Sequence, residues 1–305
     1  MTPNPTPRDG LDAFGAAALT GFALLLAFNQ VVIAVGGDGW QPVFMAALRS
    51  LGAALVLWLW VRISTGSVAS LAIPRAAWGA VVALGVCFAT EFTFLFTALD
   101  LTTVGRASVI FYAMPFWAAL GGQIFLGERI TPLKLAGLLA AFAGMAWAIL
   151  DGSAGEAGQA TLIGDLCAVG ASIMWAGTLI VVKASRARDL PAMSQLFWQV
   201  TVSAPLLLLA APFFGPLIRD LAPIHWWSLG FQAFVVASFG FVFWFWLLKL
   251  YPASTVASFS FLSPIFAVGL GALLLGEDVG PGLAGALALV TLGLILANRP
   301  QKPRG

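Results

Sequence analysis

Two stretches of this chain repeat one pattern: PFWAALGGQIFLGERITP at residues 115–132, and PIFAVGLGALLLGEDVGP at residues 264–281. Each begins with a proline, runs through eleven mostly apolar residues to a Gly-Glu pair, and ends at a second proline. The second stretch lies 149 positions after the first. Other pairs at the same offset are Pro42/Pro191, Pro74/Pro223, Gly66/Gly215 and Trp78/Trp227. A repeat of this period and length indicates a tandem duplication.

Composition places both copies in a membrane. The sequence is 60% apolar and only 9% charged, whereas a soluble domain carries about 25% charged residues. Apolar runs of about 20 residues, each long enough to cross a hydrocarbon core of about 30 Å, recur along the whole chain. We place them at 12–34, 40–62, 75–99, 102–126 and 132–150, and again at 160–183, 191–213, 226–249, 252–275 and 281–298. These runs must be helices, because backbone groups find no water in lipid.

The distribution of basic residues predicts the orientation. An even number of spans puts both termini on one side, and basic residues such as Arg62, Arg129 and Lys183 collect at the span ends that face it. The positive-inside rule therefore predicts cytoplasmic termini. The predicted parts are an N-terminal tail at 1–10, a first repeat at 11–152, a linker at 153–159, a second repeat at 160–299 and a C-terminal tail at 300–305.

The expected fold is an all-α membrane protein of ten transmembrane helices, built as two inverted-topology five-helix repeats. The inversion follows because each copy has an odd number of spans, so the second copy enters the membrane from the opposite side. Transporters use this architecture because the two halves can expose one central site alternately to each side.

Each copy resembles an EamA domain of the drug/metabolite transporter superfamily. The segments that carry the resemblance are Pro42-x6-Arg49, Pro115-x11-Gly127-Glu128-Arg129 with Pro132, and Pro264-x11-Gly276-Glu277 with Pro281. The resemblance covers residues 11–300 and implies a secondary carrier of the bacterial inner membrane, in many members an exporter of amino acids and other small metabolites. It also implies a central cavity surrounded by spans 1–4 and 6–9. The second copy has Trp198 where the first has Arg49, which confines charge-based recognition to the first half.

Arg49 and Glu91 are the clearest charges inside the predicted spans. Both lie about 12–14 Å from the same membrane surface, at 1.5 Å of helix rise per residue. Equal depth on neighbouring spans allows two interpretations. They form a structural ion pair, or they act in transport, with Arg49 attracting a substrate carboxylate or Glu91 carrying a coupling proton. Intramembrane charges are costly enough that either interpretation requires a partner.

Aromatic and amide side chains complete the candidate substrate site. The deep aromatic residues are Tyr112, Trp175, Trp198 and Trp244. They either line the cavity or pack between helices. Gln195 and Gln199 lie one helical turn apart and share a face, which is predicted to look toward protein or a cavity. Asn29 and Gln30 are expected to form hydrogen bonds between helices.

Pro115 and Pro264 lie in the middle of spans 4 and 9. A proline at such a position removes one backbone hydrogen bond and pushes against the carbonyl group four residues earlier. Both helices are therefore predicted to kink, and these prolines are candidate hinges.

The sequence also limits the energy source and the cofactors that the protein can use. The sequence has no GxxxxGK[ST] motif for a nucleotide-driven pump, and His225 is its sole histidine, so no metal site and no cofactor are expected. The predicted function is a secondary-active exporter of small metabolites such as amino acids, working by alternating access, and not an enzyme. Its expected partners are a small-molecule substrate, membrane lipid and a candidate coupling proton, with no nucleic acid. A membrane-embedded enzyme or a non-transporting sensor on the same bundle is the open alternative.

Overall fold

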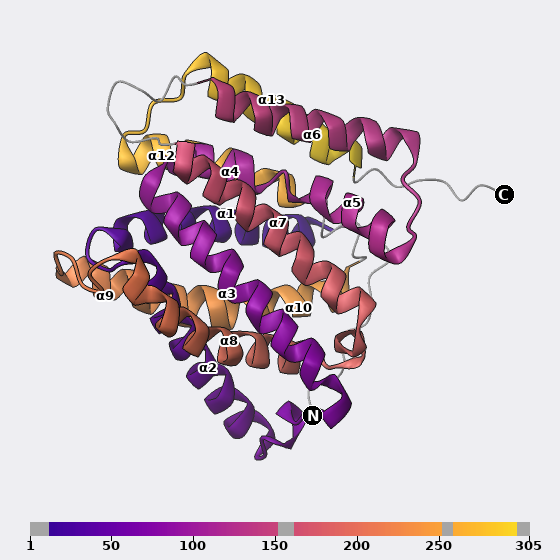
Figure 1. Cartoon of the computed structure of the whole chain (residues 1–305), viewed down its shortest axis with the longest axis vertical. Coiled ribbons are helices and arrows are strands. Elements are labelled where there is room, and N and C mark those ends of the chain that lie inside the picture. The colour runs from indigo at the N-terminus through magenta and orange to yellow at the C-terminus, as the bar shows by residue number, and fades with distance from the viewer. Residues whose placement is uncertain (1–11, 152–161, 252–258, 298–305) are drawn as a thin grey trace.

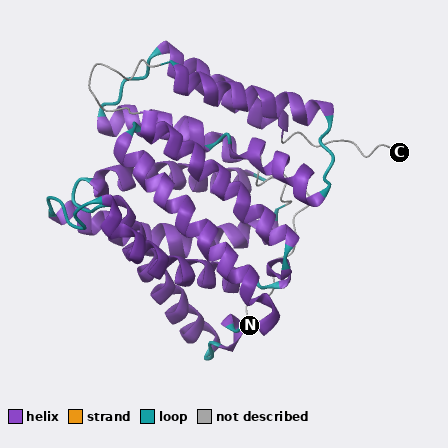
Figure 2. Ribbon diagram, viewed as in Figure 1, coloured by secondary structure: helices purple, strands orange, loops and turns teal. Residues whose placement is uncertain are grey.

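The computed structural model describes residues 12–151, 162–251 and 259–297. Every regular element within these ranges is a helix (Figure 2). In this part of the chain, eight helices are long and apolar enough to cross a membrane, and two shorter apolar helices, Leu262–Leu275 and Pro281–Ala297, accompany them. The predicted all-helical membrane fold is confirmed at this level.

The first repeat follows the predicted spans to within a few residues. Its helices are α1 (Ala13–Gly37), α2 (Pro42–Thr65), α3 (Trp78–Leu101), α4 (Val104–Phe111), α5 (Met114–Leu126) and α6 (Pro132–Leu150), with the short 3-10 turns η1 (Ala69–Leu71) and η2 (Arg75–Ala77) between α2 and α3. Helix starts are set locally. The Gln41 side chain accepts a hydrogen bond from the backbone nitrogen of Phe44 at 2.6 Å, and Pro42 begins α2, where its missing N–H is not needed.

The second repeat contains more irregular helix. Its elements are α7 (Leu162–Ala184), η3 (Arg186–Asp189), α8 (Ala192–Ala210), η4 (Ala211–Phe214), α9 (Pro223–Gly230), η5 (Phe231–Gly240), α10 (Phe241–Leu250), η6 (Phe259–Phe261), α12 (Leu262–Leu275) and α13 (Pro281–Ala297). Elements α9, η5 and α10 follow one another without a gap, and η5 is a π-helix. The first part of the predicted span 252–275 lies outside the described residues.

The predicted proline interruptions coincide with breaks in the helices. The fourth span divides between α4 and α5 at Tyr112 and Ala113, whose ψ angles are 1° and 0°. Pro115 is then the second residue of α5, and Pro264 is the third residue of α12. In both repeats the proline falls in the first turn of a new helix, where the backbone N–H that proline lacks needs no partner within the helix.

The two Gly-Glu pairs form the same turn. Gly127 and Gly276 have φ angles of +66° and +68°, a left-handed conformation that suits glycine at the end of a helix. The following backbone nitrogens, of Glu128 and Glu277, donate to the carbonyl oxygens of Gly122 and Gly271 at 3.1 and 3.2 Å. The sequence repeat is therefore also a repeat of backbone geometry.

Helices α1 and α7, which begin the two repeats, run in opposite directions. The end of α1 at Gly37 and Asp100 of α3 both bond Arg219. Asp165, at the start of α7, lies at this same end, where it bonds Thr102 just after α3. We call this the α1–α2 end, because it holds the turn between those helices, and the opposite one the α2–α3 end.

Helices α6 and α13 lie side by side at one edge of the bundle (Figure 1). Their contact uses glycine. A methyl group added at Gly293 would lie 2.5 Å from both the nitrogen of Ala141 and the carbonyl oxygen of Gly137. Only glycine lets the two backbones approach this closely.

Candidate functional site

A cavity of about 220 Å³ lies between the two repeats. Its polar and charged lining residues are Asn29, Gln30, Arg49, Glu91, Tyr112 and Ser263, and its aromatic ones include Phe22, Phe92, Phe111, Trp175, Phe241, Trp244 and Phe259. The lining as a whole comes from α1 to α5 in the first repeat and from α7, η5, α10, η6 and α12 in the second. The cavity is smaller than the 300–1,000 Å³ pockets that hold drug-sized ligands, so it suits a small solute.

Arg49 and Glu91 both line this cavity and are 3% and 4% exposed. Neither hydrogen bond nor ion pair joins them in the part of the chain that the structure describes. The Arg49 guanidinium instead lies 4.2 Å from the ring centre of Phe92 and 5.6 Å from that of Phe96. Its Nε atom is buried without a hydrogen-bond partner. The inward placement agrees with the prediction, while the structural ion pair is not formed.

Two amide side chains of α1 add neutral polarity to the cavity. Gln30 accepts a hydrogen bond from the Ser108 hydroxyl of α4, which is the interhelical bond expected from sequence. Asn29 differs, because its Oδ1 atom is buried and unpartnered. Two polar atoms of side chains that line the cavity, Asn29 Oδ1 and Arg49 Nε, are therefore buried without a hydrogen-bond partner.

Three predicted aromatic residues lie in the cavity wall: Tyr112, Trp175 and Trp244. Tyr112 occupies the break between α4 and α5. The Trp244 ring stacks on Phe22 of α1 at 4.8 Å with 22° between the planes. Their predicted location in the wall is confirmed, and their role in binding stays a prediction.

The expectation that Gln195, Gln199 and Trp198 line the cavity needs correction. None of them belongs to its lining. Gln195 Nε2 donates to the carbonyl oxygens of Ala187 and Leu190 at 2.7 and 3.0 Å. These acceptors lie just before α8, so the amide stabilises the start of its own helix and does not face a cavity.

Trp198 lies against the short 3-10 turn η1 of the first repeat. Its indole nitrogen donates to the Leu71 carbonyl oxygen at 2.7 Å, and its ring meets Trp78 at 4.9 Å. Although Trp198 is the repeat counterpart of Arg49, the two side chains have different surroundings.

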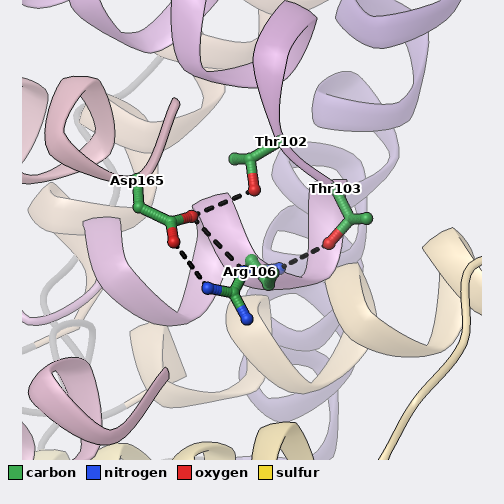
Figure 3. Close-up of polar contacts among 4 residues, drawn as sticks. All are labelled: Thr102, Thr103, Arg106 and Asp165. Atoms are coloured by element: carbon green, nitrogen blue, oxygen red, sulfur yellow. Dashed lines mark hydrogen bonds and ion pairs between the residues drawn. The ribbon is translucent and has the colours of Figure 1, made fainter. Parts of the chain in front are cut away.

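Figure 3 shows a buried polar cluster at the α1–α2 end. The sequence did not identify it. Arg106 Nη2 of α4 forms an ion pair with Asp165 Oδ2 of α7 at 2.5 Å, with 6% and 2% of the two side chains exposed. Thr102 donates to Asp165 Oδ1 at 3.0 Å. The cluster joins the two repeats, and Asp165 lies in the first turn of α7, where a negative charge is favoured.

Glu277 forms a second connection between repeats at this end. Its carboxylate accepts from the backbone nitrogens of Val104 and Gly105, at 2.5 and 2.9 Å, at the start of α4. Burial raises the pKa of Glu277, although the two backbone hydrogen bonds act in the opposite direction. The carboxylate satisfies donors that a helix start leaves open.

Arg219, in the segment between α8 and α9, forms a third connection between the repeats. It donates to the Gly37 carbonyl oxygen at 2.8 Å and to both carboxylate oxygens of Asp100 at 2.5 and 2.9 Å. The hydrogen bond to Asp100 raises the pKa of Arg219. The α1–α2 end is therefore held by several charged contacts between repeats.

The α2–α3 end is held differently. The exposed pair Lys183–Glu128 spans 2.7 Å, and the Tyr251 hydroxyl donates to Asp12 Oδ1 at 2.6 Å. Lys183 lowers the pKa of the Glu128 carboxyl through this hydrogen bond. Asp12 also accepts from the Gly15 nitrogen at the start of α1.

Comparison with protein families agrees with this architecture. Residues 13–150 and, separately, residues 162–299 match the EamA-like transporter family. Together the two matches cover most of the chain, so this protein belongs to the EamA-like transporter family. It is accordingly a multi-pass membrane protein of a transporter family.

Several relatives are similar over nearly their full length. The chain is 28% identical to the uncharacterized transporter YvbV of Bacillus subtilis, over 92% of each chain. It is 25% identical to an uncharacterized transporter of Archaeoglobus fulgidus, over 91% of this chain and 96% of that one. A solved crystal structure with 21% identity superposes with a TM-score of 0.64 over 94% of this chain and 98% of the other, which supports the fold alone.

Proposed function

We propose that this protein is a secondary-active transporter that carries a small metabolite through the central cavity by alternating access. The observation that carries the proposal is that both repeats build the wall of one cavity, in which Arg49 and Glu91 are buried without pairing. Intramembrane charges that face a cavity are typical of substrate and ion pathways. The opposite directions of α1 and α7 support an inverted-topology repeat, in which the halves exchange conformations around a fixed site.

The proposed substrate class is small metabolites such as amino acids, moved outward across the bacterial inner membrane. Amino acids combine a compact polar group with an apolar side chain, and the cavity combines two charges with an aromatic wall. With both termini in the cytoplasm, the α1–α2 end faces outward. Basic residues such as Arg62, Arg129 and Lys183 then lie on the cytoplasmic side.

In this proposal Arg49, Glu91, Tyr112, Trp175 and Trp244 form the substrate site, and the helix breaks near the two prolines act as hinges. Glu91 is the candidate carrier of a coupling proton because it is the only acidic residue in the described lining of the cavity.

Flux in proteoliposomes tests the proposal. Purified protein is reconstituted, and uptake of labelled amino acids is followed with and without a pH gradient. We expect Glu91→Gln to keep the normal folded yield and solute exchange but to lose flux driven by the gradient. The matched control is Glu128→Gln, an exposed carboxylate that does not belong to the described cavity lining. Normal gradient-driven flux in Glu91→Gln would exclude the coupling role, and absence of any flux in the unmodified protein would exclude transport of the tested solutes.

A further inference from the structure

We propose that Arg49 anchors the ligand by a carboxylate, and that the cavity therefore binds small monocarboxylates with an apolar body even when they carry no amino group. This inference rests on the cavity of the proposed function and goes further by naming the chemical group that is recognised.

The first step is the unsatisfied state of Arg49. Its side chain is buried in the cavity wall and its Nε–H has no acceptor. Neither Glu91 nor any other described residue forms a hydrogen bond or ion pair with the guanidinium. A buried guanidinium N–H without an acceptor is unfavourable, so an anion that enters the cavity and accepts from Arg49 would be stabilised there.

The second step is the orientation of the guanidinium. Phe92 and Phe96 hold it by cation–π contact, at 4.2 and 5.6 Å from its central carbon. Such contact stabilises the cation without using its N–H groups. The donors in the guanidinium plane stay available, and their fork matches the two oxygens of a carboxylate.

The third step limits the charge of the ligand. Arg49 is the only cationic residue in the described lining, and Glu91 is the only acidic one. A ligand with two negative charges, such as a phosphate monoester or a dicarboxylate, would bring a second charge with no cation to meet it. One carboxylate satisfies the site.

The fourth step concerns the rest of the ligand. The wall opposite the polar groups is aromatic, with Phe111, Trp175 and Trp244 among its members, so it suits an apolar body. An amino group would meet Glu91 when that side chain is charged, and only neutral acceptors such as the Asn29 amide when it is protonated or replaced by Gln. A neutral acceptor of this kind contributes about 1 kcal/mol, less than a hydrogen bond to a charged group. Loss of the amine should therefore weaken binding less than loss of the carboxylate.

Binding to the purified full-length protein tests this order with three probes of similar size: phenylalanine, 3-phenylpropanoate and 2-phenylethylamine. Titration calorimetry of the Glu91→Gln variant in detergent is the measurement, because this variant leaves no carboxylate in the described lining to attract the amine. We expect 3-phenylpropanoate to bind within about tenfold of phenylalanine, and 2-phenylethylamine to bind about 10- to 100-fold more weakly than the acid. Equal or tighter binding of the amine would overturn the inference, and so would binding of phenylalanine without binding of the acid.

Variants locate the effect on Arg49. Arg49→Gln should weaken 3-phenylpropanoate about 10- to 100-fold, and Arg49→Lys, which keeps the charge but not the fork, should lie between. Arg62→Gln, at the exposed end of the same helix, is the control and should bind as the unmodified protein does. If Arg49→Gln does not fold, binding of 3-phenylpropanoate to Arg49→Lys and the comparison of the three probes test the anchor instead. Unchanged acid binding in a folded Arg49 variant would refute the anchor.

The two proposals fail separately. If the acids bind but no tested solute crosses a proteoliposome membrane, transport of these solutes fails and the anchor stands. If other solutes cross but no carboxylate binds, the anchor fails and the transporter stands.

Discussion

The ion pairs Arg106–Asp165 and Lys183–Glu128 differ in how far water reaches them. The first is almost fully buried, and the second is 57% and 41% exposed. A buried charge that loses its partner has no solvent to replace it, whereas exposed charges are hydrated when they separate.

Asp165→Asn should therefore lower the free energy of unfolding by about 3–5 kcal/mol, because Arg106 stays buried and charged. Glu128→Gln should cost less than about 1 kcal/mol. Thermal denaturation in detergent measures both. Similar melting temperatures for the two variants would show that Arg106 finds another partner or water.

The pH dependence of the exposed pair can also be predicted. Lys183 lowers the pKa of Glu128 below its usual 4.5. Because the folded-state pKa is the lower one, the contribution to stability is complete above pH 4.5 and is lost as the pH falls through the folded-state value. We expect Lys183→Met to be slightly less stable than the unmodified protein at pH 7, with the difference vanishing in acid. A difference that grows in acid would contradict this assignment.

At the scale of helices, the length of the apolar runs and the repeated proline spacing predicted most of the spans, but two features were beyond them. The π-helix η5 lies in an almost uniformly apolar run, where a change of helical period leaves no pattern of polar residues to detect. Gln195 and Trp198 donate to backbone carbonyl groups of the short 3-10 turns η3 and η1. Every residue has such a carbonyl, so the sequence does not identify these acceptors.

The buried pair was missed for a related reason. Arg106 and Asp165 are 59 residues apart and belong to different repeats. Each lies near the end of a predicted span, where a charge is ordinary. Conversely, Arg49, Glu91, Tyr112, Trp175 and Trp244 were predictable because charges and large aromatics deep in a span are unusual enough to select a few positions.

The contact between α6 and α13 gives a prediction about packing. Gly293→Ala should destabilise the protein by about 1–3 kcal/mol, since the added methyl group meets backbone atoms that cannot rotate away. Gly269→Ala on α12 is the matched control, because no atom lies within 4 Å of its added methyl group. Folded yield and melting temperature are the measurements. Equal stability of the two variants would mean that the helices separate without cost.

The break before Pro115 gives a prediction about motion. Pro115→Ala restores a backbone donor, so α4 and α5 can join through Tyr112 and turn its side chain away from the cavity. We expect a normal folded yield with a slower transport rate. Pro42→Ala, at the first position of α2, should leave the rate unchanged. A normal rate in Pro115→Ala would remove the break from the hinge proposal.

For the whole molecule, the relation of the repeats is testable by labelling a pair of counterparts. Ser67 and Pro216 are 149 positions apart, and both are exposed in loops. In a background with Cys87 and Cys167 replaced by alanine, Ser67→Cys should react with an impermeant maleimide only from the cytoplasm, and Pro216→Cys only from outside. Reaction of both from one side would make the repeats parallel.

The different positions of Arg49 and Trp198 have an energetic consequence. If two identical five-helix units faced each other head to tail, each side chain would occur twice around the shared axis, and two guanidinium groups would repel across one small cavity. In such a pair the inward-open and outward-open forms are related by symmetry, so they have equal energies. This chain has one guanidinium in the cavity and an indole elsewhere. The inward-open and outward-open forms of this chain are therefore not equivalent and differ in energy. The empty protein populates them unequally even when the solutions on the two sides of the membrane are the same.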